Sequence, residues 1–227
     1  NASSRKSDEQ KLMEEYGKSI IMDYSYKYFY NDGYGKDYRI YNLKEGVDNE
    51  HRYLYLTGCL LTFYQQLKYF SAKKFELLPF NIEKPLLVFV GNKVTASTSE
   101  SELSDVQEVL TFIDEFVRKK EKTIARINDV INENTGLINE RGVDLFQHNL
   151  DPLFDVFGSK PEARVIYEDM MRTVFNSESS ADEPRLHIVN LKQIQGEVAM
   201  KIGMDGDYFG VINVGDAKKL TDKCAEI

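Results

Sequence analysis

The segment that most constrains the fold of this chain is the uninterrupted apolar run Leu86-Leu87-Val88-Phe89-Val90. Such a run is typical of a central parallel strand that is buried on both faces. A polar loop at residues 93–101 follows it, and then a helical pattern whose apolar positions recur every three or four residues up to Val117. A strand, a polar loop and an amphipathic helix in this order open a βαβ unit, so we expect an α/β fold.

Other patterns predict further helices and strands. Ser7 and Gln10 have the spacing of a capping box at the start of a helix. A long helix is expected over about residues 49–72, because apolar side chains recur along one face. These side chains are Leu56, Leu60, Phe63, Leu67 and Phe70. Residues 119–183 have a helical pattern. Alternating strands are expected at 186–191 and 197–202, a hairpin turn at Met204–Asp207, and a further, buried strand at 209–214.

Composition excludes several classes of protein. The net charge of −8 and the pI near 5.1 argue against a freestanding nucleic-acid-binding domain, although one local loop can still contact nucleic acid. No apolar run approaches the roughly 20 residues that cross a bilayer, so no membrane partner is expected. Cys59 and Cys224 are interpreted as free thiols, which favours the cytoplasm.

The two ends indicate an internal piece of a longer protein. The chain opens with Asn1-Ala2-Ser3-Ser4, which has no apolar leader, and it closes inside a helical pattern at Lys223–Ile227. We therefore expect the catalytic parts of the protein to lie elsewhere.

Short motifs do not predict a catalytic or metal site in this chain. Gly17-Lys18-Ser19 ends like a phosphate-binding P-loop, but the glycine required five positions earlier is replaced by Leu12. Asp205-Gly206-Asp207 is better explained as a hairpin turn than as a calcium loop. The three histidines do not have zinc-ligand spacing. No base and nucleophile are spaced to make Asp23, Asp32 or Asp216 a hydrolase site.

Two predicted strand ends are the candidate binding positions. Ligands bind α/β sheets at the carboxyl ends of parallel strands, where hydroxyl, amide and lysine side chains can hold a phosphate. The first set follows the apolar run and consists of Gly91, Asn92, Lys93, Thr95 and Ser97. The alternative interpretation of this segment is a solvated serine-rich loop. At the second strand end, Gly215 and Asp216 end a strand, and Asp216 is expected to cap the last helix.

A cluster of tyrosine and phenylalanine residues occupies positions 24–41. Aromatic rings of this kind stack on single-stranded bases, but Lys27, Lys36 and Arg39 are the only cations among them. Packing in a core is therefore the favoured interpretation.

Three stretches together resemble the helicase-like restriction (Res) subunit of type III restriction-modification systems and, more broadly, DEAD/DEAH-box superfamily 2 proteins. The first joins Ile20-Ile21-Met22-Asp23-Tyr24-Ser25 to residues 29–37. The second is Lys84-Pro85-Leu86-Leu87-Val88-Phe89-Val90. The third joins Gly196–Ile202 to Phe209–Asp216. The chain lacks the Walker A loop, the Asp-Glu-x-His box and the arginine finger that define the chemistry of this family.

The resemblance implies an incomplete RecA-like, P-loop NTPase-type three-layer sheet with a helical insertion. Residues 1–80 would end a first motor domain and include a linking helix. Residues 81–118 would start a second RecA-like domain, 119–185 would form the insertion, and 186–227 would continue the second domain. The parent protein would be a hydrolase that binds ATP and Mg²⁺ and moves along DNA, while this piece holds no cofactor. The loop at residues 91–97 would contact DNA phosphates, with Lys93 supplying charge and Thr95 a hydroxyl donor.

A different class of function stays open. The helical insertion would then be a non-catalytic module that docks a modification (methyltransferase) subunit or another partner. Its apolar side chains would form the interface instead of a core. These are Phe146, Phe154, Phe157, Ile166 and Val174.

Overall fold

The computed structural model describes residues 7–19, 22, 24–35, 38–43, 47–90, 100–178, 184–191, 196–214, 218 and 220–221. The chain divides into two compact units, Asn1–Asn42 and Leu43–Ile227. Among the described residues, no helix combines the length and the apolar character needed to cross a membrane.

The first unit contains two helices, α1 (Asp8–Ser19) and α2 (Tyr26–Asn31). The predicted capping box is confirmed, because the Gln10 amide donates to Ser7 Oγ at 3.2 Å and the Ser7 amide donates to Gln10 Oε1 at 3.1 Å. Helix α1 continues through Gly17 and ends at Ser19. Residues 38–43, which alternate like a strand, form no strand.

The second unit begins with the long helix α3 (Asn49–Ala72), which confirms the prediction for residues 49–72. Asp48 caps it by accepting a hydrogen bond from the His51 amide at 3.0 Å. Two short helices follow, α4 (Lys74–Leu77) and η1 (Leu78–Phe80). The remaining helices are α5 (Glu100–Arg118), α6 (Lys120–Ile131), α7 (Asp151–Phe157) and α8 (Ala163–Thr173).

Three strands form one antiparallel sheet in the order β1-β2-β3. They are β1 (Leu186–Asn190), β2 (Glu197–Ile202) and β3 (Tyr208–Asn213). Val198 of β2 lies opposite Asn190 of β1 and Ile212 of β3. Strands β1 and β2 were predicted from alternating side chains, and the turn between β2 and β3 from its Asp205-Gly206 pattern. Strand β3 was predicted as a buried strand, but its side chains are exposed or half-buried. The mixed α/β class is therefore confirmed.

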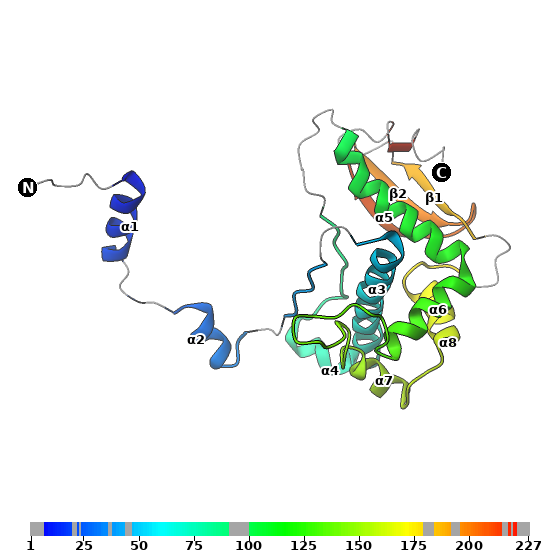
Figure 1. The fold of residues 1–227 in the computed structure, drawn as a ribbon, viewed down its shortest axis with the longest axis horizontal. Helices are drawn as coiled ribbons and strands as arrows, with labels where there is room; N and C mark the ends of the chain where they lie inside the picture. The colour runs from blue at the N-terminus through cyan, green and yellow to red at the C-terminus, as the bar shows by residue number, and fades with distance from the viewer. Residues whose placement is uncertain are drawn as a thin grey trace, which may run out of the picture. The chain divides into compact units, whose positions relative to one another are not determined.

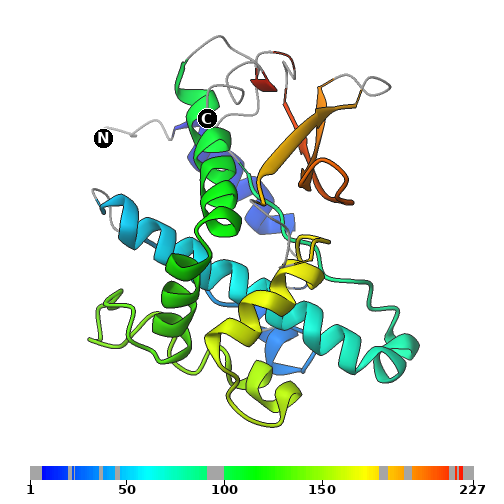
Figure 2. The ribbon, with the colours of Figure 1, turned by 90° about the vertical axis from the view of Figure 1, so that its right-hand side faces the viewer.

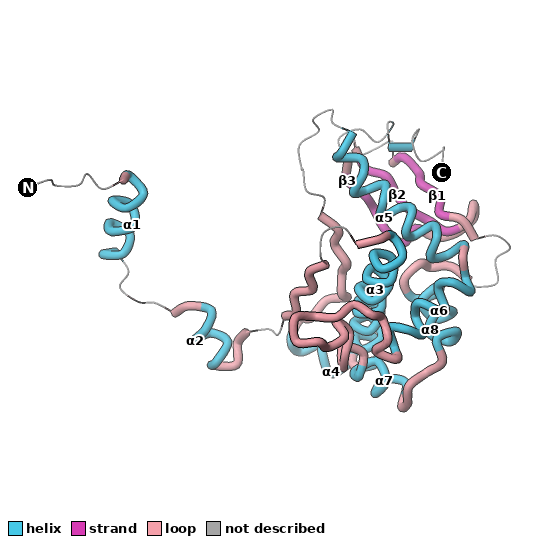
Figure 3. Tube along the Cα trace, in the orientation of Figure 1, coloured by secondary structure: helices cyan, strands magenta, loops and turns pink. Residues whose placement is uncertain are grey.

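The helices form two groups around the core. Helix α5 lies over the sheet in Figure 1, and Figure 2 shows the two side by side after a turn of 90°. The Leu186 amide of β1 donates to Asp114 Oδ1 of α5 at 3.2 Å. Helices α6, α7 and α8 pack against α3, as the tube in Figure 3 also shows. One cluster of buried side chains joins both groups.

The predicted strand at Leu86–Val90 is wrong. Residues 82–90 belong to no helix or strand, and the described sheet has no parallel pair. Leu86 and Val90 are 81% and 80% exposed, so the run is not buried on both faces. The physical reason is that a strand forms only beside a partner, and no described segment pairs with these residues.

The predicted insertion shares its core with the rest of the second unit. Phe146 and Ile166 are 1% and 0% exposed. Phe154, Phe157 and Val174 are half-buried and pack against the same core. The prediction of an interface is therefore wrong for Phe146 and Ile166, which are core side chains. For Phe154, Phe157 and Val174 it stays a prediction. The predicted division of the chain into residues 1–80, 81–118, 119–185 and 186–227 stays a prediction. All three of its boundaries lie inside the second unit.

Candidate functional site

The binding positions expected from the sequence lie outside the described residues. This holds for Gly91, Asn92, Lys93, Thr95 and Ser97, and also for Gly215 and Asp216. Their expected roles in phosphate contact and helix capping therefore stay predictions.

Two short motifs have the local structure expected for them. Gly17, Lys18 and Ser19 form the end of α1, where Ser19 Oγ donates to the Glu15 carbonyl at 3.0 Å. Their backbone is helical and is not a loop that follows a strand, which a P-loop requires. Asp205 and Asp207 lie in the connection between β2 and β3, as predicted for a turn.

The aromatic cluster of the first unit is not a buried core. Tyr24, Tyr26, Tyr34 and Tyr38 are between 45% and 69% exposed, so the prediction of core packing is wrong for these residues. Two of these tyrosine rings pack beside Phe29. The centroid of the Phe29 ring lies 6.3 Å from that of Tyr24 and 5.7 Å from that of Tyr34. Tyr24 also donates to Asp32 Oδ2 at 2.5 Å.

A surface cluster of Glu133, His148 and Asp151 was not found from the sequence. His148 Nδ1 lies 3.3 Å from Asp151 Oδ2 and 3.8 Å from Glu133 Oε1, and one ligand atom from each side chain lies within 4.8 Å of the others. An imidazole and two carboxylates are ligands for a divalent cation. The spacing His148-x-x-Asp151 was visible in the sequence, but Glu133 joins only through the loop between α6 and α7.

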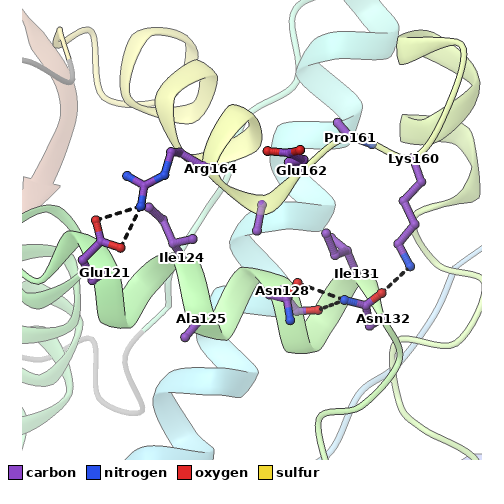
Figure 4. A pocket seen from close by; sticks show the side chains of 11 residues that line it. Glu121, Ile124, Ala125, Asn128, Ile131, Asn132, Lys160, Pro161, Glu162 and Arg164 are labelled. Atoms are coloured by element: carbon purple, nitrogen blue, oxygen red, sulfur yellow. Dashed lines mark hydrogen bonds and ion pairs between the residues drawn. The ribbon is translucent and has the colours of Figure 1, made fainter.

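A groove of about 620 Å³ runs between α6 and the start of α8 (Figure 4). Two of its basic side chains have polar partners in the groove. Arg164 Nη2 donates to both carboxylate oxygens of Glu121, at 3.0 and 2.8 Å, and Lys160 Nζ donates to Asn132 Oδ1 at 2.7 Å. Ile124, which is half-buried, contributes apolar surface. The groove therefore combines apolar and paired polar groups and has no surplus of one charge.

A buried ion-pair network links three helices. Arg126 of α6, only 4% exposed, donates from Nε to Glu50 Oε1 of α3 at 2.8 Å and from Nη2 to Glu115 Oε1 of α5 at 2.7 Å. Its guanidinium carbon lies 5.2 Å from the centre of the Tyr53 ring. Hydrogen bonds from Arg126 are the largest influence on Glu50 and lower its pKa to about 2. Because Arg126 is enclosed by these partners, we interpret the network as structural.

Among the described residues of the second unit, several exposed apolar side chains lie in the segment 75–90. Phe75, Leu78, Phe80 and Ile82 are between 50% and 87% exposed. Leu86, Val88, Phe89 and Val90 are between 50% and 81% exposed. Their burial therefore does not contribute to the core.

These geometries were compared with known proteins. No family model, no curated protein and no solved structure matches this chain. Function must therefore be inferred from the residues themselves.

Proposed function

We propose that residues 1–227 are part of an ATP-dependent DNA helicase or translocase of the kind found in type III restriction subunits. In this role the segment contributes DNA contact and scaffold. ATP and Mg²⁺ bind to parts of the longer protein that carry the Walker A loop and the acidic box. A modification subunit is the expected protein partner.

The observation that supports this proposal is the third matched stretch. Gly196–Ile202 and Phe209–Asp216 resemble a hairpin and strand of that family. In the structure, residues from these two pieces form β2 and β3, which pair in continuous register from Glu197 opposite Asn213 to Met200 opposite Gly210. Two matched pieces thus belong to one structural unit, instead of being scattered similarities along the chain.

The proposal assigns DNA contact to the loop at residues 91–97. Lys93 neutralises a backbone phosphate, and Thr95 donates a hydroxyl hydrogen bond to a phosphate oxygen. Contacts of this kind fix the position of a protein on DNA without reading its sequence. The overall acidity of the chain does not oppose such a local contact, since one lysine and backbone amides suffice.

The proposal also gives the second unit a RecA-like character. In the described structure Leu86–Val90 belongs to no strand, so this part of the proposal does not depend on that segment.

The test is a double substitution, Lys93→Ala with Thr95→Ala, in the longer protein that contains this segment. DNA-stimulated ATP hydrolysis should fall. The slope of log affinity for DNA against log salt concentration should decrease by about one unit, as expected for one lost phosphate contact. A matched control is Ser159→Ala with Lys160→Ala, which removes a hydroxyl and a lysine from the exposed connection between α7 and α8. Unchanged hydrolysis and an unchanged slope in the Lys93/Thr95 variant would refute the assignment.

Docking of a partner is the alternative function. It cannot use Phe146 and Ile166, two of the apolar side chains first considered for it, because they are buried in the core. An interaction role would have to use a different surface.

A further inference from the structure

Among the described residues, one group of histidine and acidic side chains converges closely enough to share a metal ion. The group consists of Glu133 and His148, on the loop that joins α6 to α7, and Asp151, the first residue of α7. His148 Nδ1 lies 3.3 Å from Asp151 Oδ2 and 3.8 Å from Glu133 Oε1. In a tetrahedral site with metal–ligand bonds of about 2.0–2.1 Å, two ligand atoms lie about 3.3 Å apart. The histidine and the aspartate already have this separation, and Glu133 is close to it.

The core fixes the backbone near these three residues. Each of them lies two positions from a buried apolar side chain, and these side chains are Ile131, Phe146 and Leu153. The loop is also held by Asp144, which accepts hydrogen bonds from the amides of Thr135 and Phe146, both at 2.9 Å. Ion binding therefore has to order side-chain torsions but not the backbone, and such preorganisation lowers the entropic cost of binding.

The two carboxylates carry negative charge that no basic residue offsets. Within the part of the chain that the structure describes, His148 is the only ion-pair partner of Glu133 and of Asp151. Other acidic side chains of the second unit, such as Glu115 and Asp169, pair with lysine. With a neutral imidazole the group carries two negative charges, which a divalent cation would balance. The group therefore joins a nitrogen ligand to an uncompensated pair of carboxylates.

The ligand atoms can be reached by an ion from solvent. The side chains of His148 and Asp151 are 70% and 57% exposed. Glu133 Oε1 accepts a hydrogen bond from the His148 amide at 2.9 Å. A carboxylate has two oxygens and about four lone-pair sites, so this hydrogen bond leaves room for a metal.

We propose that Glu133, His148 and Asp151 bind one zinc ion at the surface of the second unit. Imidazole nitrogen and carboxylate oxygen are both ligands of Zn²⁺, whereas Mg²⁺ and Ca²⁺ prefer oxygen alone. Three protein ligands leave the fourth tetrahedral position to a water molecule. The bound ion links the loop after α6 to the start of α7.

Isothermal titration calorimetry of the chain 1–227 with zinc tests the site. His148→Ala should weaken zinc binding at least about tenfold, since even the loss of a group that only orients a ligand weakens metal binding by about that much. His51→Ala is the matched control. His51 Nδ1 lies 2.8 Å from Asp48 Oδ2, and this is its only ion pair among the described residues. Equal zinc affinity in the unaltered chain and in His148→Ala would overturn the proposal, as would equal weakening by both substitutions.

Isosteric substitutions test the two carboxylates without changing the shape of the loop. Glu133→Gln and Asp151→Asn should each weaken zinc binding at least about tenfold, because each removes one charged ligand. Both variants should keep the urea midpoint of the unaltered chain when no metal is added. Glu140→Gln, at an exposed position of the same loop, should leave zinc affinity unchanged. Unchanged affinity in Glu133→Gln and Asp151→Asn would show that a histidine alone attracts the ion, and would overturn the three-ligand site.

Cobalt(II) in place of zinc reports which atoms hold the ion. Co²⁺ bound to the chain 1–227 should give the strong visible absorption of a tetrahedral nitrogen and oxygen site, and His148→Ala should lose it. A sulfur-to-cobalt charge-transfer band would identify cysteine as the ligand and overturn the proposal. Cobalt absorption of equal strength in His148→Ala would do the same. Mg²⁺ in about tenfold excess should not displace the cobalt, because imidazole is a poor ligand for magnesium.

The zinc site and the motor proposal stand independently. The three ligands lie outside residues 91–97, to which DNA contact is assigned. Loss of zinc binding in His148→Ala would therefore support the site whatever the Lys93/Thr95 variant does to ATP hydrolysis.

Discussion

Arg126 Nη2 donates a hydrogen bond to Glu115 Oε1 at 2.7 Å, and this bond joins α6 to α5. Both side chains are largely removed from water, with exposures of 4% and 13%. Glu115 also pairs with Lys119, at 2.6 Å, within its own helix. The junction of α3, α5 and α6 therefore depends on charges that water no longer stabilises.

Replacing Arg126 with alanine should destabilise the second unit. Removal of Arg126 leaves Glu115, which is 13% exposed, with only Lys119 and Lys122 as charged partners. We expect a loss of at most about 3 kcal/mol, the lower end for a broken buried pair. Urea denaturation measures the loss. Arg164→Ala is the matched control, because Arg164 pairs with Glu121 at the surface, where their exposures are 48% and 73%. That exposed pair should contribute less than about 1 kcal/mol to the free energy of unfolding. Equal losses in the Arg126 and Arg164 variants would contradict the prediction that the buried pair stabilises the fold more than the exposed one.

Acid should weaken the same junction through Glu50. Its pKa is lowered from 4.5 to about 2, chiefly by the hydrogen bonds from Arg126. A lowered pKa in the folded state means that the stabilisation is complete above the unfolded value and is lost as pH falls toward the folded value. The urea midpoint of the chain should therefore decrease between these two pH values. In Glu50→Gln this decrease should be smaller, while Glu140→Gln, at an exposed turn, should behave like the unaltered chain.

Gly58 should not tolerate alanine, although it lies inside a helix. A Cβ at this position of α3 would overlap the ring of Phe146. Helix propensity alone would make alanine better by about 1 kcal/mol, but overpacking in a filled core typically costs about 2 kcal/mol. Thermal denaturation should show a net loss for Gly58→Ala. Gly17→Ala in α1, where a Cβ would meet open space, should cause no loss.

A double substitution identifies the cause of that loss. In a Phe146→Leu background, Gly58→Ala should cost less than it does alone, with a coupling of about 1 kcal/mol. Additive effects of the two substitutions would show that the Phe146 ring is not the obstacle.

Tyr64→Phe should cost about 1.5 kcal/mol, the lower end for a hydrogen bond to a charged group. The Tyr64 hydroxyl, on a fully buried side chain of α3, donates to the Asp169 carboxylate of α8. Burial and this hydrogen bond raise the pKa of the Tyr64 phenol. The loss is limited because Lys68 Nζ still lies 2.9 Å from Asp169 Oδ2. Tyr69→Phe, at a 45% exposed position of α3, should leave the urea midpoint unchanged, and a similar loss there would contradict the prediction.

Local interactions made several elements predictable from the sequence. The apolar spacing of α3, the Ser7–Gln10 capping box and the alternation in β2 each depend on residues within a few positions of one another. Helical hydrogen bonds and cap contacts are satisfied inside such a segment, so its own residues decide its form.

Tertiary structure decided where those elements meet. No local pattern indicates that Phe146 lies against Gly58, or that Arg126 is enclosed by Glu50 and Glu115 from two other helices. The same holds for Glu133, which lies 15 positions from the His148 amide that donates to it at 2.9 Å. Such contacts depend on packing between distant segments, which sequence periodicity does not encode.

The run Leu86–Val90 marks the boundary between the two kinds of information. Its composition by itself predicted a strand, but the segment belongs to no strand in the structure. Whether it becomes a strand depends on a second backbone beside it, because ladder hydrogen bonds join two segments. No described segment pairs with Leu86–Val90. Only the tertiary structure could show this, because the sequence of the run does not indicate which segment lies beside it.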